Sequence, residues 1–142
     1  MNFQTKFIVL IYLLKEIWLK KGCLICYQNP MMASPFGAYI LVDPSGKYLY
    51  ANNRGHESIC VFMVSKKDGN LTYQEHVSSE GKFPWSLDIR KHAEFVLVAN
   101  QHSNNVIIFQ RDLSHGSLSK FLEITDLESP VSARFLPIPE TN

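Results

Sequence analysis

Two stretches of sequence decide the fold: YLYANNRGHESICVF at residues 48–62 and FVLVANQHSNNVIIF at residues 95–109. They are offset by 47 positions, and the alignment extends without a gap to residues 40–72 and 87–119. Few residues are identical, but the apolar positions of the two units coincide. A period in the forties that is carried by short β-type runs is typical of β-propeller blades. The sequence therefore predicts two consecutive copies of one blade.

Each unit contains four runs that favour strands, separated by turn residues. The turns include Pro44-Ser45-Gly46 and Asp68-Gly69-Asn70 in the first unit and His115-Gly116-Ser117 in the second, where glycine permits a positive φ. The predicted strands span residues 38–42, 48–53, 58–65 and 71–77, then 85–89, 95–100, 104–111 and 118–124.

A further run begins at Pro130, with Val131, Ala133 and Phe135 placed much like the residues that follow Pro84. The expected fold is therefore all-β: a partial β-propeller of about two four-stranded antiparallel blades plus an extra strand, with an N-terminal helix. Because a propeller closes with about four to eight blades, we expect a truncated or split reading frame of a larger protein. The alternative is an intact small protein that completes its ring by association.

The predicted domains are a non-propeller, helical segment at residues 1–33, the blades at residues 34–137 and a tail at residues 138–142. The apolar stretch at residues 7–14 is too short to span a bilayer, and Lys15-Glu16 interrupts it. We expect a helix there that packs on the domain. A membrane or export role is the less favoured interpretation.

The composition excludes few classes of function, but the cysteine content indicates the redox compartment. Fourteen basic and thirteen acidic residues give a formal net charge of +1, which offers no reason to expect a nucleic-acid partner. Three cysteines without a disulfide framework predict a reducing compartment, and hence the cytoplasm. Cys23 and Cys26 form a lone C-x-x-C without a second ligand pair, so no metal site is predicted. Cys60, between Ile59 and Val61, is expected to be a buried strand residue.

The loop after the second strand of each unit differs between the copies in one informative way. Arg54 in the first copy corresponds to Gln101 in the second. A cation that one copy carries and the other lacks is a candidate for a site used once. A surface arginine on a blade connection is the plain alternative.

Three segments resemble one known family: SGKYLYANNRGHESI at residues 45–59, EGKFP at residues 80–84 and VANQ at residues 98–101. They are similar to the C-terminal blades of the seven-bladed β-propeller lactonases, the 6-phosphogluconolactonase type that is related to the carboxy-muconate lactonizing enzymes. The resemblance runs from about Ser34 to Pro137. It implies hydrolysis of 6-phospho-glucono-1,5-lactone in the pentose phosphate pathway, a phosphorylated sugar lactone as substrate and no cofactor.

The resemblance also implies roles for individual residues. Lactone opening transfers an acyl group to water, which requires a base and donors for the tetrahedral oxyanion. Three residues are the catalytic candidates, with Arg54 as the anion or oxyanion donor, His56 as a base or second donor, and Glu80 as an orienting group. The candidates for substrate binding are Asn53, Arg54, Gln101 and His102.

One residue departs from the family pattern. The family usually carries Pro-Arg where this chain has Pro84-Trp85. Losing that cation should weaken the binding of an anionic substrate. The chain is thus expected to be the C-terminal third of a lactonase, inactive alone. The alternatives are a non-catalytic propeller piece that binds another chain, or itself, through open blade edges, and a decayed gene product.

Overall fold

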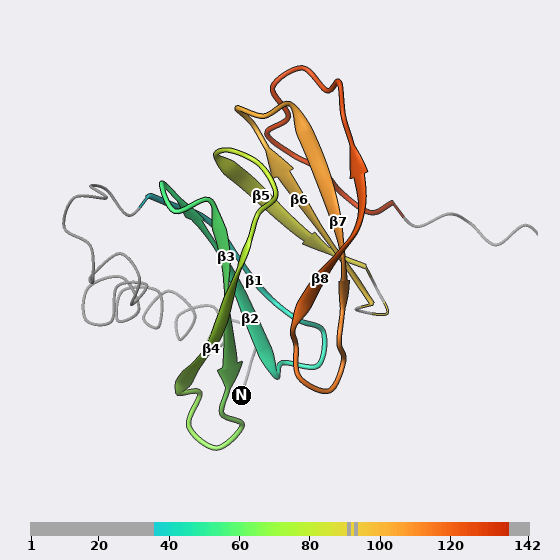
Figure 1. Ribbon diagram of the computed structural model, residues 1–142. Helices are drawn as coiled ribbons and strands as arrows, with labels where there is room; N and C mark the ends of the chain where they lie inside the picture. The colour runs from blue at the N-terminus through green and yellow to red at the C-terminus, as the bar shows by residue number, and fades with distance from the viewer. Residues whose placement is uncertain (1–35, 91, 93, 137–142) are drawn as a thin grey trace, which may run out of the picture. The chain divides into compact units, whose positions relative to one another are not determined.

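The computed structural model describes residues 36–90, 92 and 94–136. These residues form eight β-strands (Figure 1). The strands are β1 (Phe36–Val42), β2 (Tyr48–Arg54), β3 (Ser58–Val64), β4 (Leu71–Ser78), β5 (Pro84–Ile89), β6 (Phe95–Asn100), β7 (Asn105–Arg111) and β8 (Leu118–Ile124). The predicted strands are confirmed, with bounds that differ by one or two residues.

The strands form two antiparallel sheets, in the orders β1-β2-β3-β4 and β5-β6-β7-β8. The two sheets repeat each other in register as well as in order. The register between β3 and β4 shifts at Val61/Phe62, and that between β7 and β8 shifts at Ile108/Phe109, 47 residues later. The prediction of two four-stranded blades is therefore confirmed, and the two copies also share the position of an irregularity.

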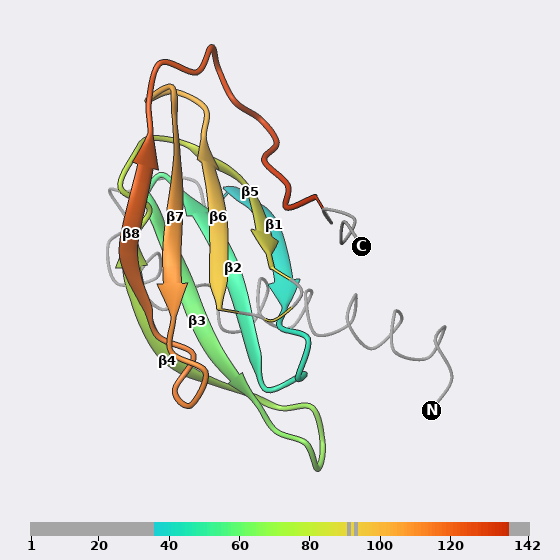
Figure 2. The same cartoon turned by 90° about the vertical axis from the view of Figure 1, so that its right-hand side faces the viewer.

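The two sheets pack face to face over one apolar core (Figure 2). The contribution of β2 is Tyr48 and Tyr50, and that of β6 is Val96 and Val98; all four are at most 6% exposed. Because side chains alternate along a strand, the intervening residues of β6 point to the opposite face of the second sheet. Leu97 accordingly belongs to a separate apolar cluster. Cys60 is buried, as predicted.

A buried ion pair joins the two sheets at the end where the β1–β2 and β7–β8 turns lie. Arg111 Nη1 lies 2.9 Å from Asp43 Oδ2, and both side chains are at most 3% exposed. Arg111 also donates a hydrogen bond to the Tyr50 hydroxyl, which itself donates to Gly116 O at 2.7 Å. Burial raises the pKa of Tyr50 to about 12. This hydroxyl therefore stays protonated and can serve as a donor.

Residues 125–136 follow β8 and contain no strand, so the predicted extra strand is corrected. The segment runs beside β5 instead (Figure 2). Ala133 N donates to Ser86 Oγ at 3.3 Å, and Phe135 N donates to Asp88 Oδ2 at 2.7 Å. Its amides are thus satisfied by side chains of β5 rather than by a backbone ladder, which is why no regular strand forms. Both bonds join residues 47 apart, the offset of the repeat.

The predicted N-terminal helix, the Cys23/Cys26 motif and the tail at residues 138–142 lie outside the described residues. Within the described part of the chain, no helix is long and apolar enough to cross a membrane.

Candidate functional site

The candidate site residues gather at one end of the two sheets, where β2 and β6 end. Three segments meet there: the β2–β3 loop, the β4–β5 connection at residues 79–83 and the β6–β7 loop. The connection is tied to both sheets. Ser79 N donates to Glu57 O at 2.9 Å, and Lys82 N donates to Ser103 Oγ at 2.8 Å. A loop that links the sheets is thereby held in one place.

Arg54, the last residue of β2, lies against two aromatic rings of the neighbouring sheet. Its guanidinium carbon is 4.8 Å from the centre of the Phe83 ring and 4.7 Å from that of Trp85. Both distances are within the range of favourable cation–π contacts. The rings hold the plane of the guanidinium across the junction between the sheets. Trp85, at the position where the resemblance implies a second arginine, therefore contributes a ring that contacts Arg54.

The Phe83 ring continues the stack toward the β6–β7 loop. It also stacks on the His102 ring, with centroids 4.3 Å apart and planes inclined by 14°. Phe83 has a φ of 59°, a left-handed conformation that a bulky residue seldom adopts. The backbone amide of Phe83 donates to Glu57 Oε2, and Phe83 O accepts a hydrogen bond from Gln101 N at 3.1 Å. The strained residue is thus fastened on both sides.

Glu57 and Phe83 were not predicted as site residues. A glutamate beside a loop glycine and an aromatic before a proline are common surface residues, so neither carries a motif. The one available signal is the repeat, because EGKFP falls where two blades must be joined.

His56 does not join this stack. Its Nδ1 lies 2.9 Å from Ser58 Oγ, and its ring meets the edge of the His76 ring of β4, with centroids 5.1 Å apart. His76 in turn shares a hydrogen bond of 2.7 Å with the Tyr73 hydroxyl. The contacts of His56 are therefore with β3 and β4, whereas Arg54 contacts the residues around β5.

Glu80 is exposed, and its carboxylate faces β8 rather than Arg54. Its Oε2 lies 3.5 Å from Lys120 Nζ, and its backbone oxygen accepts from Asn105 Nδ2 at 3.0 Å. Glu80 has a φ of 55°. The contacts described for Glu80 position the connection between the sheets and bring no catalytic partner to it.

Asn53 of the first sheet is equivalent to Asn100 of the second. Asn100 is fully buried, and its Nδ2 donates to Ser79 O at 2.9 Å. Asn53 is also buried, at 2% exposure. Asn100 thus fastens the connection that precedes its sheet. Among the six predicted residues, the structure brings Arg54 and His102 together through Phe83, with Gln101 beside them.

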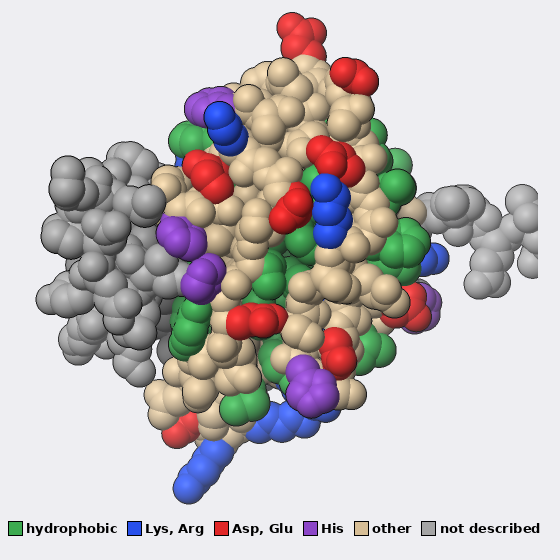
Figure 3. Space-filling view, in the orientation of Figure 1, with side chains coloured by type: hydrophobic (Ala, Val, Ile, Leu, Met, Phe, Trp, Pro, Cys, Tyr) green, Lys and Arg blue, Asp and Glu red, His purple; other side chains and the backbone are tan. Residues whose placement is uncertain are grey.

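No group of three or more metal-ligating side chains occurs within residues 36–90, 92 and 94–136. Charged side chains of both signs are interspersed over the face shown in Figure 3.

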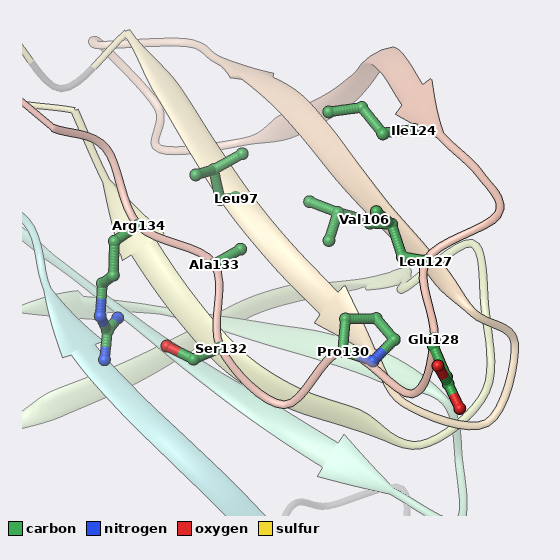
Figure 4. A pocket seen from close by; sticks show the side chains of 9 residues that line it. All are labelled: Leu97, Val106, Ile124, Leu127, Glu128, Pro130, Ser132, Ala133 and Arg134. Carbon is green, nitrogen blue, oxygen red and sulfur yellow. The ribbon is translucent and has the colours of Figure 1, made fainter.

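A hollow lies on the outward face of the second sheet (Figure 4). It is an apolar groove of about 460 Å³ between the sheet and the segment that follows β8. Leu97, Val106 and Ile124 form its sheet side, and Leu127, Pro130 and Ala133 form the other. Glu128, Ser132 and Arg134 also line it.

Two repeated antiparallel four-stranded sheets, packed face to face and joined at a loop-rich end, define a pair of adjacent β-propeller blades. The family model "Lactonase, 7-bladed beta-propeller" matches residues 20–135. The chain belongs to the seven-bladed β-propeller lactonase family.

Individual relatives agree with this assignment. The chain is 44% identical over 85 residues to a 6-phosphogluconolactonase of Formosa agariphila, and 34% identical over 100 residues to one of Bacillus subtilis. These alignments cover 58% and 70% of this chain but only 24% and 29% of the relatives. The chain thus spans 24% to 29% of the length of these relatives.

Solved structures give the same result. The periplasmic gluconolactonase PpgL of Pseudomonas aeruginosa has a TM-score of 0.68 and 28% identity, over 75% of this chain and 31% of that one. A putative 6-phosphogluconolactonase of Bacteroides uniformis has a TM-score of 0.64 and 31% identity, over 68% and 28%.

Proposed function

We propose that this chain contributes two adjacent blades of a propeller that hydrolyses a phosphorylated sugar lactone, 6-phospho-glucono-1,5-lactone. The observation that carries the proposal is the placement of Arg54. It ends a strand at the loop-rich junction of two blades, and two aromatic rings orient its guanidinium. The family membership and the names of the relatives supply the reaction class.

Arg54 acts as a donor for the anionic groups of the reaction. Its planar fork suits a phosphate, a carboxylate or the oxyanion that forms when water attacks the lactone carbonyl. His102, stacked on the same Phe83 ring, is the nearest candidate for a second contact to substrate. His56 and Glu80 are weaker candidates for the roles that the resemblance implies, because their described contacts lead away from Arg54.

The proposal includes association with further blades. The groove on the second sheet is apolar, and Leu122 and Ile124 of β8 are 48% and 42% exposed. Such a face is stabilised when another blade covers it. We therefore propose that activity belongs to an assembly in which this face is covered, and that the isolated chain is inactive. The cytoplasm remains the proposed location.

The test joins a mass measurement to an assay. Native chain is fractionated by size exclusion with light scattering, and each fraction is assayed on freshly generated 6-phospho-glucono-1,5-lactone. We expect hydrolysis above the spontaneous rate only in an assembled fraction. In that fraction Arg54→Met should lower kcat/KM by about 10²-fold, the usual effect of removing one oxyanion donor.

Arg90→Met is the matched control, because Arg90 is an exposed arginine just after β5, at the other end of the sheet. Equal rates for the two variants would remove Arg54 from the mechanism. An assembled species without activity would favour the second candidate function, a non-catalytic blade pair that binds another chain through the same apolar face. Trp85→Arg separates the two. A hydrolase should retain or gain activity from the added cation, because the Phe83 ring still contacts Arg54. A binding surface that uses Trp85 should lose affinity.

A further inference from the structure

Two buried asparagines lie at the junction of the sheets with amide atoms that have no hydrogen-bond partner among the described residues. Asn52 is 1% exposed, and both its Nδ2 and its Oδ1 are unpartnered. Asn100 is fully buried, and its Oδ1 is unpartnered although its Nδ2 is bonded to Ser79 O. Three polar atoms are therefore buried without a partner in one region of the fold.

Strand alternation places both side chains on the facing sides of the two sheets. Asn52 follows Tyr50 by two residues on β2, and Asn100 follows Val98 by two residues on β6. Tyr50 and Val98 belong to the core between the sheets. Because residues i and i+2 share a face of a strand, Asn52 and Asn100 face that same interface, at the end where Arg54 lies.

A short path of contacts also connects the two asparagines. Asn100 Nδ2 reaches Ser79 O, and Ser79 N reaches Glu57 O, which directly precedes β3. Asn52 pairs with Ile59 near the start of the same strand. The two amides thus enter the interface from opposite sheets, near the residues that Ser79 joins.

Leaving these atoms unpartnered would be costly. A buried donor or acceptor without a hydrogen bond destabilises a fold by about 1–3 kcal/mol. Proteins avoid that loss with internal water, at a rate of roughly one buried water per 27 residues, each with about three hydrogen bonds. A water molecule can accept from an amide nitrogen and donate to an amide oxygen at once.

Only the first of the two repeat copies carries an asparagine at the position of Asn52. The residue equivalent to Asn52 in the second sheet is Ala99, which is buried in the apolar cluster on the outward face. The next interface therefore lacks the amide. The polar position is specific to the junction that carries Arg54, two residues further along the same face of β2.

We propose that Asn52 and Asn100 bind one buried water molecule between the two sheets. The water donates to Asn100 Oδ1 and bonds to Asn52 through one of its amide atoms. It holds the sheets at a fixed spacing beneath Arg54 and the Phe83 and Trp85 rings. This inference does not depend on the reaction proposed above.

Nuclear magnetic resonance of the full chain tests the proposal directly. We expect the side-chain amide protons of Asn52 or Asn100 to show cross-peaks to water with opposite signs in NOE and ROE spectra, the mark of a long-lived water. Asn70 is the internal reference: its Nδ2 donates to Asp68 Oδ2 on the surface, where only short-lived water is expected. Absence of the opposite-sign cross-peaks, or a direct contact between the two amides, would overturn the proposal.

Asn52→Leu provides a second, independent readout with a predicted sign. If a water bridges the amides, the apolar side chain displaces it and leaves Asn100 Oδ1 unpartnered, so the unfolding midpoint falls and the water cross-peaks disappear from Asn100. If the amide of Asn52 is buried without water, its removal relieves a desolvation penalty, and the midpoint stays or rises. The latter result contradicts the proposal even where the variant folds normally.

Discussion

The guanidinium of Arg54 in the first blade lies 4.7 Å from the centre of the Trp85 ring in the second. A cation of one sheet is thus bound by an aromatic side chain of the other. Trp85 is 37% exposed, so the contact lies at the rim of the junction rather than in its core. The same tryptophan stands where the family resemblance implies a second arginine, and its ring contacts the arginine that this chain retains.

Replacing Trp85 should show what the ring contributes. Trp85→Leu keeps an apolar side chain but removes the negative face of the ring, and we expect the free energy of unfolding to fall by about 0.5–1 kcal/mol beyond the loss from packing. Trp85→Phe is the matched control, since it retains an aromatic face and should lose less. Urea unfolding of both variants, each also combined with Arg54→Met, measures the difference. If the two substitutions cost the same in the Arg54→Met background but not alone, the cation–π contact is the cause.

Gly116 should tolerate no side chain, for reasons of space rather than of backbone alone. A Cβ at this position would lie 2.4 Å from the Tyr48 ring, and its φ is 74°. Gly46 has a similar φ of 70° with nothing within 4 Å of the added atom. Gly46→Ala should therefore cost about 1–2 kcal/mol for the left-handed backbone. Gly116→Ala should cost roughly 1–3 kcal/mol more, because the ring must move. Equal losses in denaturant titrations would contradict the packing of Tyr48 on the second blade.

The ion pair between Asp43 and Arg111 should dominate the acid sensitivity of the junction. Burial alone would raise the pKa of Asp43, but hydrogen bonds from Ser45 and Tyr48 and the contact with Arg111 outweigh it and hold the pKa below its ordinary value. A depressed carboxyl pKa stabilises the fold above the unfolded-state value, and this stabilisation is lost as the pH falls through the lower, folded-state value.

We therefore expect Asp43→Asn to reduce the free energy of unfolding at pH 7 by about 3–5 kcal/mol, because Arg111 is left buried without its counter-ion. The variant should also lose less stability than the unmodified protein as the pH falls from about 5 to about 2. This range follows from the pKa of an aspartate in the unfolded chain, about 4, and from the lowered pKa of Asp43 in the folded protein. Asp126→Asn, at an exposed position, is the control and should change neither quantity. Parallel acid titration curves for the Asp43 variant and the unmodified protein would refute this account.

The segment after β8 should depend on side chains of β5. Asp88→Ala removes the acceptor for Phe135 N, and we expect that amide to exchange with solvent roughly tenfold faster, as for a lost hydrogen bond of about 1–1.5 kcal/mol. Asp88→Asn retains an oxygen acceptor and should change exchange far less. The amide of Leu127, which donates to Asn104 O at 3.1 Å, is the internal control. Equal acceleration at Leu127 would mean that the whole segment opens for another reason.

Much of the fold was predictable because each strand is indicated in both copies of the repeat. The bounds of a strand in one copy agree with those of the equivalent strand in the other, and turn glycines mark the ends of strands. The prediction of an extra strand after β8 was wrong. The apolar pattern there matches a strand, but the side chains of Ser86 and Asp88 accept the hydrogen bonds of the Ala133 and Phe135 amides. A sequence pattern reports which residues face a core, but it does not report which group accepts a hydrogen bond.

The candidate site was less predictable. Arg54 was found because the two copies differ there. Glu57 and Phe83 were missed because their roles arise from positive φ values and from contacts between segments about 25 residues apart, which no local motif encodes. His56 and Glu80 were predicted from the resemblance, and their described neighbours are His76 and Lys120 rather than Arg54.

The connection at residues 79–83 is anchored to Glu57 on one blade and to Ser103 on the other. A ligand that meets Phe83 and Trp85 therefore encounters a surface already in its final form. Ligand binding at this rim should require no conformational change of the protein. Association rates should then be set by diffusion and charge rather than by the opening of a loop. Selectivity among the ligands of this rim would then depend on its shape and not on its motion.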